Sequence, residues 1–209
     1  MRQTVAASVA AKVVSVACTF AQVPLALHAL GAEAYGVWIT LATLGLMLNF
    51  VDFGLGVGLQ RGLGDAWARG DAARMQRLLF TGTLALGGLA AAGFILGAGL
   101  VMLRDWSSAF NIASPALRAE LRPALLLALA TGALGIPLNA LARLAAATRL
   151  GWLHAGWIAA GSVLTLAAIA AAARAGLGLI VFTAIAGVVP LVQGVALGLH
   201  LRRKLGWRW

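Results

Sequence analysis

The sequence predicts an all-helical, polytopic membrane protein that forms a single domain over residues 1–209. Of its residues, 62% are hydrophobic and only 11% are charged, and the mean hydropathy is +0.94. A soluble domain has about half apolar and a quarter charged residues. Because the apolar excess runs along the whole chain, a soluble body with one membrane anchor is excluded. The apolar runs are continuous and rich in alanine and leucine, which favours spanning helices over the short alternating strands of a barrel.

Six apolar segments reach the length of roughly 20 residues that a spanning helix needs. The first is expected to remain uncleaved, because Lys12 interrupts the apolar core that a signal peptide would require. A tight turn over 31–34 joins this segment to the second. Ser114, followed by proline, predicts a short surface helix over 115–121, after which Pro123 opens the fourth segment. The six expected spans are 4–30, 35–59, 78–103, 124–142, 152–173 and 177–199.

Lysine and arginine are distributed unequally between the two sides of this topology. A membrane protein retains its basic residues on the cytoplasmic side, so a count of eleven against four places both termini in the cytoplasm. The poorer side holds Arg104, Arg118, Arg122 and Arg174. The richer side holds Arg2, Arg61, Arg69, Arg74, Arg77, Arg143, Arg149, Arg202, Arg203, Lys204 and Arg208.

The net charge of +10 is therefore explained by the membrane and its lipids. No basic face is interleaved with aromatic residues, so no nucleic-acid partner is expected. The histidines lack ligand spacing, and no nucleophile lies beside a base. We expect no metal, no cofactor and no enzymatic activity.

The first span carries a polar stripe, because its polar residues recur at intervals of three or four. Two interpretations are open. The stripe is either polar glue between packed helices or the wall of a hydrated cavity, and the lysine within it favours the cavity. The stripe consists of Thr4, Ser8, Lys12, Ser15, Thr19 and Gln22.

Lys12 and Asp52 are predicted to lie at equal depth in the first two spans. Both lie about seven or eight residues from the cytoplasmic ends of those spans, which is roughly 10–12 Å below the surface. Since a tight turn joins two antiparallel helices, we expect an ion pair or a water-bridged pair at the cavity wall. Alternatively, the pair only neutralises two buried charges for folding. Asn49 precedes Asp52 by three residues and shares its face.

Arginines at the cytoplasmic ends of the second and fourth spans complete the candidate site. Gln60 and Arg61 close the second span. Arg143 and Arg149 flank the end of the fourth, with Asn139 one turn before Arg143. Guanidinium groups bind phosphate bidentately, so these arginines could receive a phosphate that enters from the cytoplasmic leaflet. For any single arginine, the ordinary excess of basic residues on the cytoplasmic side is the competing explanation.

Two glycine pairs have the small-xxx-small spacing that permits close helix contact. They are Gly93/Gly97 and Gly194/Gly198. Such pairs are common in membrane helices, so no function is assigned to them.

Several short motifs occur in an order typical of one family. They are Leu30-Gly31, Tyr35-Gly36-Val37-Trp38, Asp52-Phe53-Gly54-Leu55-Gly56 with Arg61, Ile136-Pro137-Leu138 with Arg143, and Gly176-Leu177-Gly178. Together they resemble the Wzx-type polysaccharide flippases. These are the O-antigen and capsule translocases of the multidrug/oligosaccharidyl-lipid/polysaccharide exporter superfamily.

The resemblance implies translocation of an undecaprenyl-diphosphate-linked oligosaccharide across the bacterial cytoplasmic (inner) membrane, for lipopolysaccharide O-antigen or other cell-surface polysaccharide. It implies alternating access through a cationic cavity between two six-helix lobes. This chain matches the N-terminal lobe. A second lobe is expected from a separate chain, from a second copy in a homodimer, or from the rest of a longer reading frame. The expected cavity residues are Lys12, Gln22, Asn49, Asp52, Arg61, Asn139 and Arg143.

Two other functions stay open. A multidrug or small-cation exporter of the same superfamily would favour acidic and aromatic cavity residues, whereas Asp52 is expected opposite a lysine. A non-transporting structural subunit of a glycan-assembly complex would use the polar stripe as helix glue.

Overall fold

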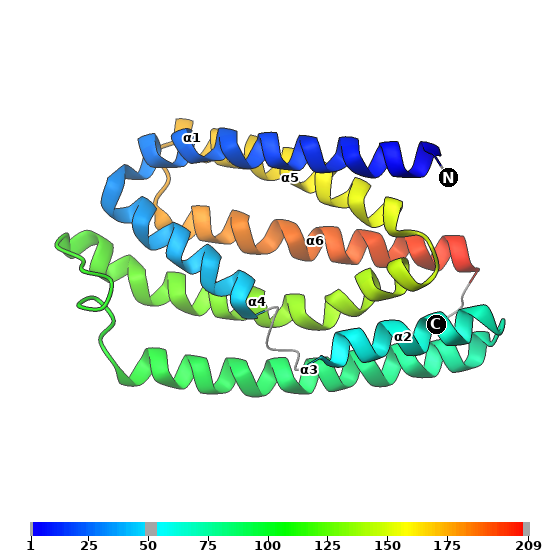
Figure 1. Ribbon diagram of the computed structural model, residues 1–209. Coiled ribbons are helices and arrows are strands. Elements are labelled where there is room, and N and C mark those ends of the chain that lie inside the picture. Colours follow the sequence, from blue (N-terminus) through cyan, green and yellow to red (C-terminus); the bar gives the residue numbers. More distant parts are fainter. Residues whose placement is uncertain (1, 49–53, 207–209) are drawn as a thin grey trace.

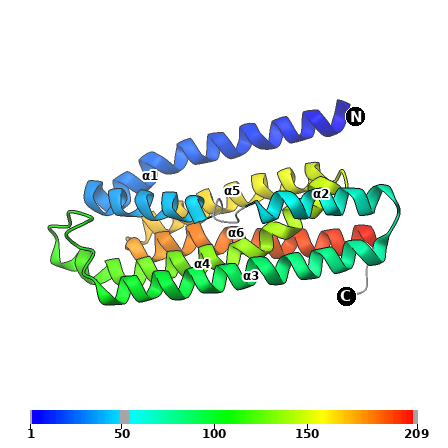
Figure 2. The same cartoon turned by 60° about the horizontal axis from the view of Figure 1, so that its bottom comes forward.

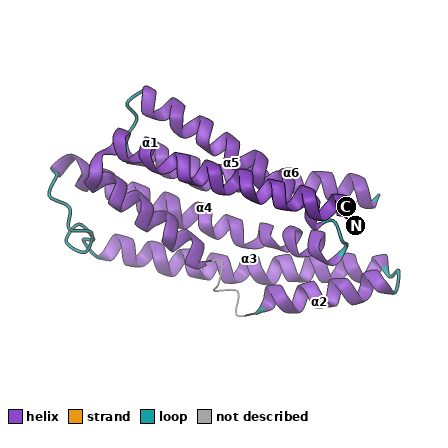
Figure 3. Cartoon of the chain, turned by 45° about the horizontal axis from the view of Figure 1, so that its top comes forward, coloured by secondary structure: helices purple, strands orange, loops and turns teal. Residues whose placement is uncertain are grey.

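The computed structural model describes residues 2–48 and 54–206, and the regular structure in these two ranges is entirely helical (Figure 3). The expected all-helical class is confirmed. The helices lie side by side along the long direction of the molecule (Figure 1). They are α1 (Arg2–Leu48), α2 (Leu55–Ala68), α3 (Ala72–Leu103), α4 (Pro115–Ala147), α5 (Gly151–Arg174) and α6 (Leu179–Leu205).

α1 is broken at Gly31, where the backbone (φ 76°, ψ 167°) is not helical. Glycine adopts a positive φ readily because it has no Cβ. The chain reverses at this residue, and the limb after Gly31 runs back toward the middle of the bundle (Figure 1). The turn expected at 31–34 therefore exists, although one residue is enough to make it.

The second expected span, 35–59, is wrong as a single helix. α1 ends at Leu48, and α2 begins at Leu55 after Gly54, whose φ is 82°. The limb of α1 after Gly31 and α2 itself are roughly 25 Å and 21 Å long, short of the bilayer core of about 30 Å. Within the described ranges, five helices rather than six are long and apolar enough to span a membrane.

α4 is longer than the expected fourth span, because it begins at Pro115 and continues through Pro123. The separate surface helix expected at 115–121 is therefore wrong. Proline lacks an N–H, so Pro123 leaves the carbonyl of Ala119 without its usual helical donor. Ala119 is exposed near the helix end, where water can replace that donor.

α4 is the helix that all the others share. It packs against α1, α2, α3, α5 and α6, whereas α1 packs mainly on α5. Buried apolar side chains form two cores along the bundle. One contains Trp38 edge-on to Phe182, with ring centroids 6.1 Å apart. The other contains Leu63, Met75 and Leu144.

α4 approaches α6 closely at the second of the two glycine pairs. A Cβ at Gly194 would lie 3.1 Å from Cδ1 of Leu138, and a Cβ at Gly198 would lie 2.8 Å from Cδ1 of Leu141. The leucines of α4 therefore fill the space that side chains at these glycines would need. Gly97 plays the same part for α3, since a Cβ there would lie 3.3 Å from Leu129 of α4.

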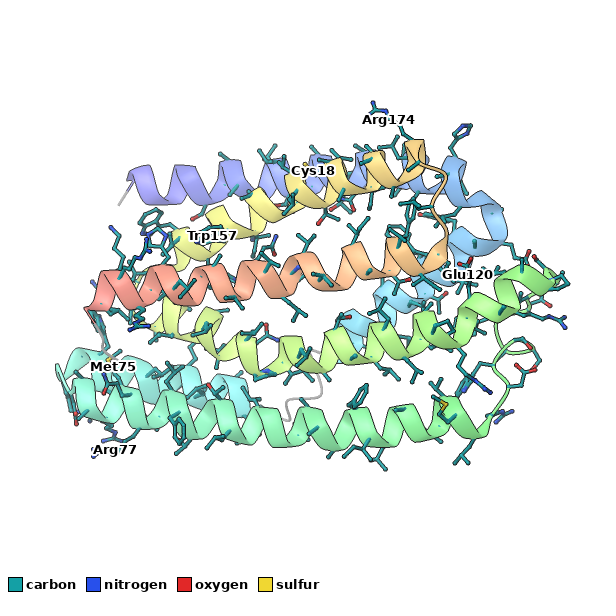
Figure 4. All side chains as sticks on the ribbon, turned by 180° about the vertical axis from the view of Figure 1, so that it is seen from behind. Cys18, Met75, Arg77, Glu120, Trp157 and Arg174 are labelled. Carbon is teal, nitrogen blue, oxygen red and sulfur yellow. The ribbon has the colours of Figure 1, made fainter. Side chains whose placement is uncertain are left out.

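Two carboxylates lie at helix N-termini, where the partial positive charge of the helix stabilises them. Oε1 of Glu33 accepts hydrogen bonds from the backbone N–H groups of Ala113 (2.6 Å) and Ser114 (3.2 Å) at the start of α4. The carboxylate of Glu120 lies beside Gly178 at the start of α6, where a Cβ would meet its Oε1 at 2.9 Å. Figure 4 shows Glu120 at the end of the bundle opposite Met75.

The outer surface of the bundle is apolar. Phe20, Ile95 and Leu96 are 74%, 68% and 70% exposed, and exposed apolar residues recur along each long helix. An apolar surface of this extent is unfavourable in water and favourable in lipid. The chain is therefore a multi-pass helical membrane protein.

Replacing Gly187 by alanine is expected to lower the free energy of unfolding by about 1–3 kcal/mol, because overpacking a close contact forces the neighbours apart. The new Cβ would collide with buried Thr131 of α4, whose hydroxyl is held by the carbonyl of Leu127. Thermal unfolding in detergent measures the change. Gly93→Ala is the matched control, since nothing lies within 4 Å of its Cβ position. Equal melting temperatures for the two variants would contradict the contact.

Replacing Glu33 by alanine is expected to destabilise the protein by about 1–2 kcal/mol, because two backbone donors at the start of α4 lose their acceptor. Glu33→Gln keeps an amide oxygen and is expected to lose less. Denaturant unfolding in micelles ranks the free energies of unfolding of the wild type and the two variants. The exposed acid Asp65 provides a control, Asp65→Ala. A Glu33→Ala variant as stable as this control would show that the hydrogen bonds from Ala113 and Ser114 do not contribute to stability.

Candidate functional site

Two of the predicted site residues lie together at the contact between α2 and α4. Arg143 is half-buried on α4, and its Nη1 donates a hydrogen bond of 3.4 Å to Oε1 of Gln60 on α2. This distance is long for an N–H···O bond, so the bond is weak. Asn139 lies one turn before Arg143 on the same face of α4 and is also half-buried. The structure thus places a guanidinium and two amides along one interface.

The rotation of α2 decides which of its polar residues meets Arg143. Leu59 and Leu63 are buried. Leu59 packs directly against Gly82 of α3, since a Cβ at Gly82 would lie only 2.8 Å from both Cδ atoms of Leu59. These contacts fix the apolar side of α2 against α3 and α4. Gln60 is then half-buried at the border of that side, whereas Arg61 is exposed.

Arg61 is exposed, and its role as a cavity residue stays a prediction; its neighbour Gln60 is the residue of α2 that contacts Arg143. Successive residues on a helix point about 100° apart, so both side chains cannot face the same partner. The signal for Gln60 was its place directly after Leu59 and three residues before Leu63, which the sequence shows as the apolar side.

Two hydroxyl groups of the polar stripe of α1 are bonded within their own helix. Oγ of Ser15 donates to the carbonyl of Ala11 (3.0 Å), and Oγ1 of Thr19 donates to the carbonyl of Ser15 (2.9 Å). Hydroxyl groups often bond to the preceding turn in this way, so these two need no acceptor on another helix. Gln22 is half-buried, and Lys12 is exposed on the outer side of α1.

Asn49 and Asp52 lie outside the described residues. The ion pair between Lys12 and Asp52 therefore stays a prediction.

The fold and these contacts define a helical membrane protein with a polar, cationic contact between two of its helices. Within residues 2–48 and 54–206, no cluster of three His, Cys, Asp or Glu side chains lies close enough together to hold a metal ion. A guanidinium flanked by amides binds anionic oxygen atoms and does not by itself catalyse a reaction. No family model, no curated protein and no solved structure matches this chain.

A double-mutant cycle on Gln60 and Arg143 is expected to give a coupling energy below about 1 kcal/mol, because their hydrogen bond is long and only half-buried. The four forms are the wild type, Gln60→Ala, Arg143→Ala and the double variant, each unfolded thermally in detergent. Arg61→Ala paired with Arg143→Ala is the matched control, and its coupling is expected to be zero. A larger coupling for Arg61 than for Gln60 would overturn the observed rotation of α2.

Proposed function

We propose that this chain forms one lobe of a transporter that moves an undecaprenyl-diphosphate-linked oligosaccharide from the cytoplasmic to the periplasmic leaflet of the bacterial inner membrane. One observation carries the proposal: Arg143 is half-buried near one end of α4, beside the amides of Gln60 and Asn139. A guanidinium in this position at the membrane surface is suited to bind an anionic phosphate oxygen. The resemblance to Wzx-type flippases adds the substrate class.

The depth of Arg143 suits a substrate with a phosphate at the membrane surface. Arg143 precedes the C-terminal residue of α4, Ala147, by four positions, so it lies roughly 6 Å from that end of the helix. A guanidinium stays charged at all physiological pH values and pairs with two phosphate oxygens at once. Asn139, one turn deeper, offers an amide to the same group.

The distribution of basic residues supports the direction of transport. α1 begins and α6 ends at the same end of the bundle (Figure 2), and the α2–α3 and α4–α5 turns lie there too. Arg69, Arg149 and the Arg202–Lys204 run all belong to this end. By the positive-inside rule this end faces the cytoplasm, and Arg143 then opens toward the leaflet where the substrate is made.

A second lobe would complete the cavity. Lys12 is exposed on α1 rather than packed against the other helices, so a second copy or a separate chain can supply the facing wall. An exposed ammonium in lipid alone would be costly. A hydrated cavity between two lobes removes that cost.

The proposal is tested in cells whose surface polysaccharide depends on this protein. Arg143→Gln and Lys12→Asp are each expected to reduce export about tenfold or more, since a charged hydrogen bond to phosphate is lost or reversed. The double variant Lys12→Asp/Asp52→Lys is expected to recover part of it. Surface polysaccharide and the lipid-linked precursor left inside are measured together.

Arg174→Gln is the matched control, because Arg174 is exposed at the other end of the bundle. Unchanged export in all the variants would remove the cavity role and leave a structural subunit. Deletion that lowers drug resistance while surface polysaccharide stays normal would instead identify a drug exporter.

A further inference from the structure

The segment between α3 and α4 lines a half-open cavity at the end of the bundle away from the two termini. Its volume is about 310 Å³, within the range of about 300–1,000 Å³ for small-ligand pockets. Part of its lining is apolar and comes from the end of α3 and the first turns of α4. The remaining part is charged and consists of Arg104, Asp105, Arg118 and Arg122.

The cavity is built by specific bonds. Nε and Nη2 of Arg118 donate to the carbonyl of Ile112 at 3.0 Å and 2.8 Å, which holds the loop onto α4. Nε1 of Trp106 donates to the carbonyl of Leu100 at 3.2 Å, which holds the loop onto α3. The wall that carries the charges is thus fixed from both sides before any ligand arrives.

Asp105, the single carboxylate among the residues that line the cavity, is already hydrogen-bonded within the loop. Asp105 accepts hydrogen bonds from the backbone N–H (3.0 Å) and the hydroxyl (2.7 Å) of Ser107. These bonds lower the pKa of the Asp105 carboxyl, and the charges of Arg118 and Arg122 lower it further. Asp105 is therefore ionised at neutral pH and offsets one of three guanidinium charges, so the cavity remains cationic.

The cavity lies at the level where the helices leave the lipid. Leu103, the last residue of α3, is 88% exposed, and Arg104 follows it directly. An exposed leucine next to an arginine marks the border between hydrocarbon and headgroups, where phosphate groups are concentrated. Tryptophan is enriched at the same border, and Trp106 lines the cavity.

We propose that this cavity binds a phosphate-bearing anion, either the phosphate of a lipid headgroup or a soluble phosphate. The arginines supply the charge and the bidentate geometry, and their exposure leaves them accessible to an anion from the membrane surface or from solution. The site lies at the opposite end of the bundle from Arg143, so it stands without the transport proposal.

The site is tested by protection of a cysteine placed inside it. Ala119 lines the cavity and is exposed, and the lone native cysteine, Cys18, is buried. The full chain with Cys18→Ala and Ala119→Cys is placed in micelles of dodecyl maltoside, which carries no phosphate, and the rate of maleimide labelling is measured. The probes are inorganic phosphate and phosphatidylglycerol, each added separately to these micelles. Ala109→Cys is the control, because Ala109 is exposed in the same loop but does not line the cavity.

Labelling at position 119 is expected to slow with a bound phosphate while labelling at 109 does not. Arg104→Gln with Arg122→Gln is expected to weaken the protecting affinity about tenfold or more, because charge-assisted bonds are lost. Arg122→Lys is expected to keep part of it, and Arg174→Gln all of it. Protection by phosphatidylglycerol alone identifies a lipid headgroup, and protection by phosphate as well identifies a soluble anion site.

Absence of protection by both probes in the otherwise native chain overturns the proposal, whatever the arginine variants do. Equal slowing at positions 119 and 109 also overturns it, because that result reports general adsorption to the loop. Protection that survives Arg104→Gln/Arg122→Gln does the same, because the cationic wall would then be irrelevant.

Discussion

The close packing of α4 on α6 is the contact on which the rest of the bundle depends. Lipid is as apolar as leucine, so membrane helices associate through short-range packing rather than through hydrophobic burial. At Gly187, Gly194 and Gly198 the side chains of α4 lie directly against the backbone of α6. These contacts fix the depth and the rotation of α4 relative to α6. Because α4 also packs against α2, the position of α4 determines where Arg143 meets Gln60.

Helix ends impose a second constraint, since each leaves backbone groups that need partners. At the end of the bundle that contains the Gly31 turn, acidic side chains lie at the beginnings of two helices. Glu33 accepts from the backbone N–H groups of Ala113 and Ser114, the two residues before α4. Glu120 lies beside Gly178, which directly precedes α6. Two of the few acidic residues in the chain are used in this way. The turn at Gly31 is therefore held in place by the hydrogen bonds that Glu33, two residues further on, accepts from Ala113 and Ser114.

The sequence predicts those features that one helix contains within itself. The expected span 152–173 differs from α5 by one residue at each end, and Asn139 with Arg143 follows from helical periodicity alone. Features that depend on two segments were missed. The apolar composition of 35–59 predicts one span and does not register the positive φ of Gly54. Gln60 borders the apolar side that Leu59 and Leu63 mark in the sequence, but the packing of that side against Gly82 of α3 is a contact with a second helix, which α2 alone does not reveal.

The arginines at the two ends of the bundle follow different physical rules. At the end where the termini lie, the described basic side chains are spread over several helix ends and turns. At the other end, residues 2–48 and 54–206 place four arginines, and three of them, Arg104, Arg118 and Arg122, line one cavity with one carboxylate. Like charges at close range repel, and a dispersed arrangement would cost less. The phosphate-bearing anion proposed for this cavity would offset the repulsion among the three guanidinium groups.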